Sequence, residues 1–186
     1  MGHGGNVIAE LMADHREVEQ MFDQIQALPA GDAKRRDIAD QFTIELVRHS
    51  VAEEMYLYPA VRDHVPGGDM IADRELKDHA AVERLLKELE QAPVEGAEFD
   101  ALLTRIVAEV SEHVADEETN LFPALSGVCS PDQLDQLGDK IRAAKKVAPT
   151  RPHPSAPDTP PGNKLLAPGT GLVDRVRDFV TGRGKS

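Results

Sequence analysis

The stretch HSVAEEMYLYPA at residues 49–60 occurs a second time, in altered form, as HVADEETNLFPA at residues 113–124. Further upstream, DHREVE at 14–19 occurs again as DHAAVE at 78–83. Both pairs are separated by the same 64 residues. The chain therefore contains an internal duplication, in which the first half of the body is a diverged copy of the second half.

The residues around these repeats have the apolar spacing and the boundaries of long helices. Pro-containing breaks at 29–31, 66–68 and 93 separate them, and Ser130-Pro131 is typical of a further helix start. The sequence thus predicts helices over about 6–28, 32–64, 69–91, 96–125 and 130–146. Because the breaks are short, we expect an all-α protein, namely an up-down-up-down four-helix bundle with an added fifth helix.

Composition changes near Val147 and divides the chain into three parts. Residues 1–146 carry 15 Lys and Arg against 30 Asp and Glu, a net charge of −15, and form the predicted bundle domain. Residues 147–170 are rich in Pro and Gly and are predicted to be a linker. Residues 171–186 are predicted to be a short amphipathic segment, with one apolar stripe made of Leu172, Val173, Val176, Phe179 and Val180.

The bulk composition restricts location and partners. The net charge of −12 argues against nucleic acid as a partner, because phosphate binding depends on Lys and Arg. Cys129 is the single cysteine, so no internal disulfide forms, and a cytoplasmic location is expected. We expect no signal peptide and no transmembrane segment, because no apolar run approaches the roughly 20 residues that span a bilayer.

The repeated residues include metal-binding side chains at corresponding positions. His49 and Glu53 are four residues apart and share one helix face, as do His113 and Glu117. If the two halves pack about a pseudo-two-fold axis, His15 and His79 join them. Four imidazoles and two carboxylates then face one cavity. Such donors suit two cations bridged by the two carboxylates.

This order of motifs resembles the hemerythrin-like (HHE) cation-binding domain, of the H…HxxxE…H…HxxxE type found in bacteria. The resemblance covers about residues 6–126. It implies a non-haem di-iron centre, with two iron ions joined by an oxo or hydroxo bridge. The ligands that it implies are His15, His49, Glu53, His79, His113 and Glu117.

The sequence departs from the oxygen-carrying hemerythrins at two places. They have a second His one turn after the third-helix ligand, where this chain has Glu83, and their fourth helix usually offers H-x-x-x-x-D. Glu83 is therefore a candidate ligand, or a group that orients an imidazole. Tyr56 shares the expected face of His49 and Glu53, so it is a candidate for packing above the metals, for hydrogen bonding or for iron binding.

Six other residues are given lesser roles. Tyr58 is interpreted as a core residue. Glu54 and Glu118 are interpreted as solvated or as partners of the ligands. His153 lies outside the repeat register, as do His3 and His64, and is left out of the predicted site.

The resemblance implies that the protein reacts with hydrogen peroxide or related small oxidants in a catalase-like way, under oxidative or nitrosative stress. The carboxylate in place of a fifth His favours this redox reaction over reversible oxygen carriage. The alternative is a protein that binds or senses oxygen, nitric oxide or iron without turnover. The C-terminal segment is a candidate for weak contact with a partner or a membrane surface.

Overall fold

The computed structural model describes residues 3–184, apart from the side chain of Leu165. In this part of the chain all regular structure is helical, which confirms the predicted all-α class. The elements in chain order are α1 (Val7–Ala27), α2 (Lys34–Ala52), η1 (Glu53–Leu57), α3 (Tyr58–His64), α4 (Gly68–Leu89), α5 (Ala97–Asp116), η2 (Glu117–Leu121), α6 (Phe122–Val128), α7 (Pro131–Val147) and α8 (Gly162–Thr181).

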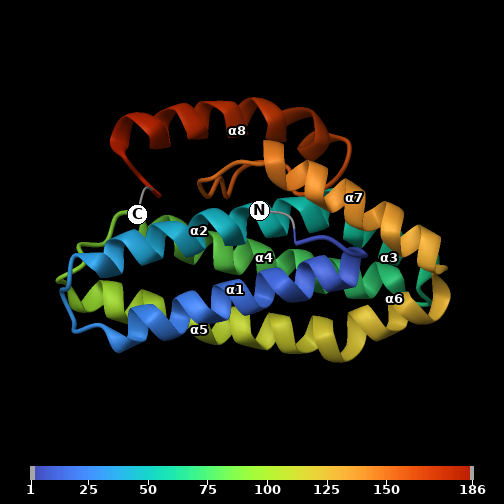
Figure 1. Cartoon of the computed structure of the whole chain (residues 1–186), viewed down its shortest axis with the longest axis horizontal. Coiled ribbons are helices and arrows are strands. Elements are labelled where there is room, and N and C mark those ends of the chain that lie inside the picture. The colour runs from blue at the N-terminus through green and yellow to red at the C-terminus, as the bar shows by residue number, and fades with distance from the viewer. Residues whose placement is uncertain (1–2, 185–186) are drawn as a thin grey trace.

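The long helices form the predicted up-down-up-down bundle (Figure 1). Helix α1 packs against α2, and α4 packs against α5, so that each repeat is one antiparallel pair. Helix α7 contacts α1 and α2, and α8 forms an outer layer over the bundle (Figure 1). The Ser130 hydroxyl accepts the Gln133 N–H at the start of α7, which is the cap that the sequence predicts.

The predicted break at residues 66–68 depends on two glycines. Gly67 has a φ of +74°, a conformation that strongly favours glycine. A Cβ on Gly68 would lie 2.1 Å from the carbonyl oxygen of Val61. The chain can therefore pass directly from α3 into α4 and return along the bundle.

Two long helices that we predicted as regular contain a π-helical turn. The Tyr58 N–H donates to the carbonyl of Glu53, and the Phe122 N–H donates to the carbonyl of Glu117, both across five residues. Pro59 and Pro123 follow immediately. A proline has no N–H to complete the α-helical pattern, so a wider turn is favoured there.

The bundle core consists of two apolar clusters. One, around Phe22, Phe42 and Phe99, fills the end near the α1–α2 connection. The other, around Leu57 and Leu121, fills the opposite end and includes residues of α7. Between the two clusters lies a layer of buried polar side chains. These polar side chains, lying between the apolar clusters, form the candidate site.

The C-terminal part differs from the prediction. The linker ends at Pro161, nine residues earlier than expected, because α8 begins at Gly162 and continues through Pro168. A Cβ on Gly171 would lie 2.2 Å from the carbonyl oxygen of Val147, so glycine permits the close approach of α8 to the end of α7. The Pro and Gly content of residues 162–170 predicted a linker, but contacts with the rest of the protein outweigh their low helix propensity. No helix in the described part of the chain has the length and apolarity to cross a membrane.

Candidate metal centre

Six of the seven predicted metal ligands meet in the buried layer at the middle of the bundle. His15 comes from α1 and His79 from α4, while the other four residues come from the α2–η1 and α5–η2 segments. All six side chains are at most 8% exposed, and the two glutamates are completely buried. The six are His15, His49, Glu53, His79, His113 and Glu117.

Each buried glutamate lies between imidazoles of two different helices. Glu53 Oε2 is 3.1 Å from His49 Nε2 and 3.3 Å from His79 Nε2. Its repeat counterpart Glu117 follows the same pattern, with Oε2 at 3.7 Å from His113 Nε2 and at 3.3 Å from His15 Nε2. The pseudo-two-fold relation that we predicted therefore extends to individual atoms.

The donor atoms fall into groups that share carboxylates. His15, His49, Glu53 and Glu117 form one group in which the ligand atoms lie within 4.8 Å of one another. Glu53, His79 and His113 form another. Because Glu53 belongs to both, the arrangement suits two cations that share a bridging carboxylate.

The other ring nitrogen of every one of these imidazoles faces a carboxylate. His15 Nδ1 is 2.8 Å from Glu118 Oε1, and His79 Nδ1 is 3.1 Å from Glu54 Oε1. Glu54 and Glu118 therefore touch the predicted ligands, as one of our two interpretations held. A carboxylate on Nδ1 fixes the tautomer and the ring orientation and leaves Nε2 to bind a metal.

The remaining two imidazoles break the repeat symmetry. His49 Nδ1 lies 3.2 Å from Asp14 Oδ2, whereas His113 Nδ1 lies 3.0 Å from Glu75 Oε2. The repeat counterpart of Asp14 is Asp78, not Glu75. Comparison of the two halves therefore did not predict Asp14 or Glu75 as a partner of an imidazole. Both are identified by their contacts in the structure.

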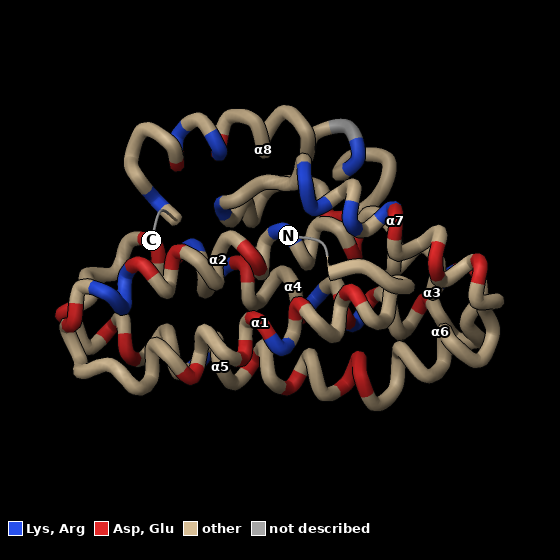
Figure 2. The backbone as a smooth tube through the Cα atoms, viewed as in Figure 1, with Lys and Arg blue, Asp and Glu red and all other residues tan. Residues whose placement is uncertain are grey.

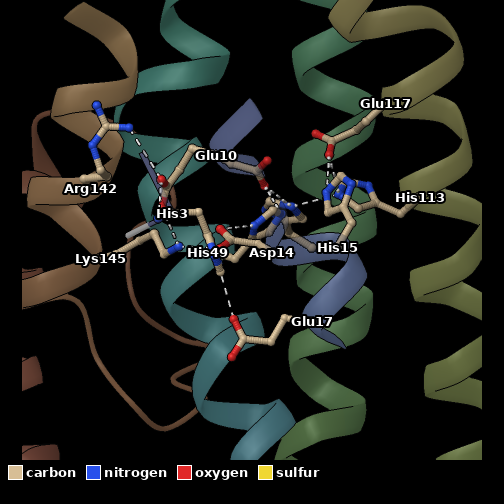
Figure 3. Close-up of polar contacts among 12 residues, drawn as sticks. His3, Glu10, Asp14, His15, Glu17, His49, His113, Glu117, Arg142 and Lys145 are labelled. Atoms are coloured by element: carbon tan, nitrogen blue, oxygen red, sulfur yellow. Dashed lines mark hydrogen bonds and ion pairs between the residues drawn. The ribbon is translucent and has the colours of Figure 1, made fainter. Parts of the chain in front are cut away.

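Helix α7 contributes a buried cation beside the site (Figure 3). Lys145 Nζ donates to Asp14 Oδ1 at 2.5 Å and to Glu10 Oε1 at 3.0 Å. Burial opposes this charge, but the two carboxylates still raise the pKa of Lys145. The contact also helps to hold the pKa of Asp14 below its usual range. Asp14 is thus a charged acceptor for His49.

Several polar atoms in the layer lack a hydrogen-bond partner within the described part of the chain. They include His15 Nε2, Glu53 Oε1 and Glu117 Oε2. A buried polar atom without a partner costs on the order of 1–3 kcal/mol. All three belong to the predicted ligand set, and a pair of cations would satisfy them. The donor set therefore fits metal.

Without a metal the site holds protons instead. Burial opposes the charged imidazole, but Glu53 and Glu54 raise the pKa of His79 to about 10. His49 has its pKa raised well above the ordinary value by Glu53 and Asp14, again against burial. The same contacts hold the pKa of Glu53 well below its usual range. A metal would have to displace these protons.

Tyr58, rather than Tyr56, is the phenol at the centre. Its hydroxyl lies 2.9 Å from His79 Nε2 and donates to Glu117 Oε1 at 3.3 Å. The expectation that Tyr56 shares the ligand face is wrong, because it assumed about 3.6 residues per turn through the π-helical segment. In the wider turn, the residue five positions after Glu53 returns to the same face. Burial raises the pKa of Tyr58 well above its ordinary value, so the phenol keeps its proton.

Tyr56 and Glu83 lie away from these atoms. The Tyr56 ring packs under Lys164 of α8, whose Nζ is 4.5 Å from the ring centroid. Glu83 Oε1 accepts the backbone N–H of His153 at 2.8 Å. Glu83 is therefore tied to the segment that precedes α8 and belongs to none of the donor groups found in the described residues.

None of the three histidines left out of the predicted site is buried. His3 Nε2 is 3.2 Å from Asp14 Oδ1 and 3.3 Å from Glu17 Oε2 (Figure 3). His153 Nε2 is 2.9 Å from Asp174 Oδ2. His64 is exposed at the end of α3.

The sequence of this chain is similar to those of known hemerythrin-like proteins. The family model of the hemerythrin HHE cation binding domain matches residues 6–125. A hemerythrin-like protein of Schizosaccharomyces pombe is 26% identical over 171 residues, which cover 91% of this chain and 84% of that protein. A Nostoc protein named DNA nickase is 30% identical over 142 residues, which are 75% of this chain but 39% of that protein.

A solved structure shows the same fold. A hemerythrin HHE cation binding domain-containing protein from Mycobacterium kansasii superimposes with a TM-score of 0.67 at 22% sequence identity. The match covers 77% of this chain and 86% of that one. With the family match over residues 6–125 and the buried His and Glu clusters, the resemblance inferred from the repeats is confirmed. The chain belongs to the hemerythrin HHE cation-binding domain family.

Proposed function

We propose that this protein is a non-haem di-iron protein that decomposes hydrogen peroxide in a catalase-like reaction. The observation that carries the proposal is the carboxylate facing Nδ1 of each of the four imidazoles, in addition to the two glutamates between them. Carboxylates at these positions make the imidazoles stronger donors. The added negative charge favours the ferric state over the ferrous state, and so favours redox turnover over reversible oxygen binding.

The reaction consumes two molecules of hydrogen peroxide. One is reduced to two water molecules and takes up two electrons and two protons, while the other is oxidised to dioxygen and releases the same number. Bound iron supplies the two-electron store. Tyr58 keeps its phenolic proton and lies within 3.3 Å of Glu117 Oε1, so it is suited to hold and pass on a proton.

A cavity in the buried layer limits which molecules can react. It has a volume of about 20 Å³ and contacts all four of the imidazoles. A single water needs on the order of 10–15 Å³ measured in this way. The cavity therefore admits one molecule of the size of water, peroxide or dioxygen, and this argues for a small inorganic substrate.

Oxygen evolution from the iron-loaded protein tests the proposal. Peroxide should be decomposed with release of half a mole of dioxygen per mole of peroxide. His113→Ala removes one imidazole donor, so its rate should fall by at least 100-fold. If the wild-type protein binds iron but releases no dioxygen, the proposal is wrong.

A second candidate function is binding or sensing of dioxygen or nitric oxide without turnover. It is favoured by the apolar part of the cavity wall, formed by Val18, Leu46, Val82, Val110 and Val114. Such a wall suits an uncharged diatomic molecule. A stable spectral adduct with either gas, together with absent peroxide turnover, would favour this function.

A further inference from the structure

A second cavity lies directly outside the one that touches the imidazoles. It is enclosed by α2, α4 and residues 149–158, the segment that precedes α8, and its volume is about 80 Å³. Leu46, Ser50, His79 and Val82 belong to the walls of both cavities. The outer cavity thus adjoins the inner one, and His79 of the candidate metal centre lines both.

We propose that the outer cavity is where a small uncharged oxidant is held on its way to the metal centre, and that residues 149–158 form a roof that limits the size of the ligand. This inference rests on the proposed function, because it names the ligand class and the route for that same site. It assigns a role to a segment that lies beyond the family match at residues 6–125.

The roof is held onto the bundle by specific contacts. The His153 N–H donates to Glu83 Oε1 at 2.8 Å, and the Arg151 guanidinium lies 3.4 Å from Glu90 Oε1. Both carboxylates belong to the α4 region of the bundle. Glu83, which the sequence suggested as a metal ligand, therefore binds the roof to α4.

The charges in the wall disfavour anions. The wall contains the carboxyl groups of Glu54, Glu83 and Asp158. Its three basic side chains are already paired with carboxylates. Arg151 faces Asp178 at 2.6 Å as well as Glu90, and His153 faces Asp174. His79 faces Glu53 and Glu54. An anionic ligand would thus meet carboxylates without a free cation, whereas a neutral molecule pays no such penalty.

The volume disfavours bulky oxidants. At on the order of 10–15 Å³ per water, 80 Å³ holds about five to eight water-sized molecules. Hydrogen peroxide fits this space, but an organic hydroperoxide that carries a phenyl group does not. We therefore expect the iron-loaded protein to react with hydrogen peroxide at least tenfold faster than with cumene hydroperoxide.

A matched pair of variants on α4 tests the route. Ala80 is half-buried and lines the outer cavity, while its neighbour Ala81 is also half-buried but lies in the wall of neither cavity. Ala80→Leu should slow the association of nitric oxide with the reduced, iron-loaded protein by at least tenfold at unchanged iron content. Ala81→Leu should stay within twofold of the wild type.

A measurement without iron supports the same test. Dissolved oxygen is paramagnetic and speeds the relaxation of nearby methyl protons, so the metal-free protein under oxygen pressure should show this effect at Val47 and Val82. Ala80→Leu should abolish it at Val47. Equal behaviour of the two leucine variants in both measurements would overturn the inference, as would equal rates with the two peroxides. If peroxide is not turned over but Ala80→Leu still slows nitric oxide, only the proposed function fails.

A separate observation concerns the outer face of α8. The predicted apolar stripe exists, but the structure turns it outward: Val173 is 67% exposed and Val180 is 77% exposed, and Leu172 and Val176 are exposed as well. The inner face carries the acidic residues instead. Asp174 accepts the Thr150 N–H, and Asp178 accepts the Thr150 hydroxyl.

This orientation leaves only basic charges among the exposed charged residues of the helix. Arg177 is exposed next to Val176, while Lys164 packs over the Tyr56 ring and Arg175 donates to the carbonyl of Ala148. Both aspartates of α8 are buried. Figure 2 shows Lys and Arg segments on α8, above a bundle in which Asp and Glu segments occur throughout. An apolar face that is flanked by the exposed Arg177, on a helix without an exposed acidic residue, complements an anionic lipid surface.

We infer that α8 attaches the protein to anionic lipid surfaces. The acidic bundle would be repelled, but α8 lies as an outer layer, and the repulsion is screened over about 8–10 Å at physiological salt. A second copy of the chain is a poorer occupant, because two such faces would bring the exposed Arg177 of one copy toward that of the other.

Vesicle flotation tests this attachment. The full chain should float with vesicles of phosphatidylglycerol and phosphatidylcholine at low salt, and not with phosphatidylcholine alone. The double variant Val173→Asn/Val180→Asn should reduce binding at least tenfold, whereas Met70→Asn, at an equally exposed apolar residue on α4, should not. Absence of flotation, equal flotation of all variants, or a doubled mass in solution without flotation would overturn the inference.

Discussion

The hydroxyl oxygen of Tyr58 lies 2.9 Å from Nε2 of His79, and the two residues come from different helices of the bundle. This contact depends on the π-helical turn at Glu53–Leu57, since a regular helix would rotate the phenol away. The π-helical turn thus places the Tyr58 hydroxyl, which carries a proton, at the candidate metal centre. It also assigns the two neighbouring tyrosines different roles.

Tyr58→Phe should lower peroxide turnover without emptying the metal site. The ring still fills its buried position, but the proton donor is lost, and a positioned acid or base contributes on the order of 10²-fold or more. We expect kcat to fall by about that factor, with iron content unchanged. Tyr56→Phe is the control and should match the wild type. If Tyr56→Phe is the impaired variant, the assignment of the phenol is wrong.

Asp14→Asn should weaken metal binding, because the amide no longer supplies a negative acceptor to His49 Nδ1. Loss of such a partner typically costs about 10–100-fold in metal affinity. Asp78→Asn changes the repeat counterpart, whose place beside the imidazole is taken by Glu75, and should have little effect. Competition with a chelator, followed by iron analysis, measures both variants. Equal losses in the two variants would contradict the asymmetric pairing.

Lys145→Met should destabilise the metal-free protein. Lys145 is 5% exposed and lies between Glu10 and Asp14, so its loss removes the buried cation from both carboxylates. Glu10 keeps Arg142 at 3.4 Å, and Asp14 loses its lysine partner. Removing one partner of a buried ion pair costs about 3–5 kcal/mol. Denaturant unfolding should show this loss, and Lys146→Met, at an exposed neighbour, should not. A loss below about 1 kcal/mol would show that the ion pair does not hold α7 in place.

The stability of the metal-free protein should fall as pH rises from about 6.5 to about 10. Against the effect of burial, Glu53 and Glu54 raise the pKa of His79 to about 10 in the folded protein, compared with about 6.5 when unfolded. Its contribution is therefore complete below pH 6.5 and is lost as pH approaches 10. Unfolding free energies at pH 6, 8 and 9.5 measure the trend. His79→Gln should flatten it, and an unchanged slope in that variant would contradict the assignment.

The repeat was sufficient to predict the bundle and the six donors that converge in it. Because both copies carry His and Glu at matching places, packing the halves about one axis brings these side chains together whatever the details of the turns. The same comparison could not find Glu75, since the partner that it suggests for His113 is Asp78. The π-helical turns could have been predicted from Pro59 and Pro123, which follow them directly. We assumed regular α-helical periodicity through both segments instead.

The C-terminal extension was the hardest part to predict. An apolar stripe on a helix usually faces the core, but in α8 the buried contacts are made by Asp174 and Asp178. Their partners are Thr150, Arg151 and His153, in a segment that composition alone describes only as a linker. Which face of α8 turns inward therefore depends on ion pairs between segments that local sequence patterns do not relate.

The most direct test of a two-metal centre is the iron content of the protein after anaerobic loading with ferrous iron and removal of unbound metal. Two groups of buried donors that share Glu53 should bind two iron ions per chain, and Glu53→Ala should reduce that number. A wild-type content of one iron or none per chain would contradict the account.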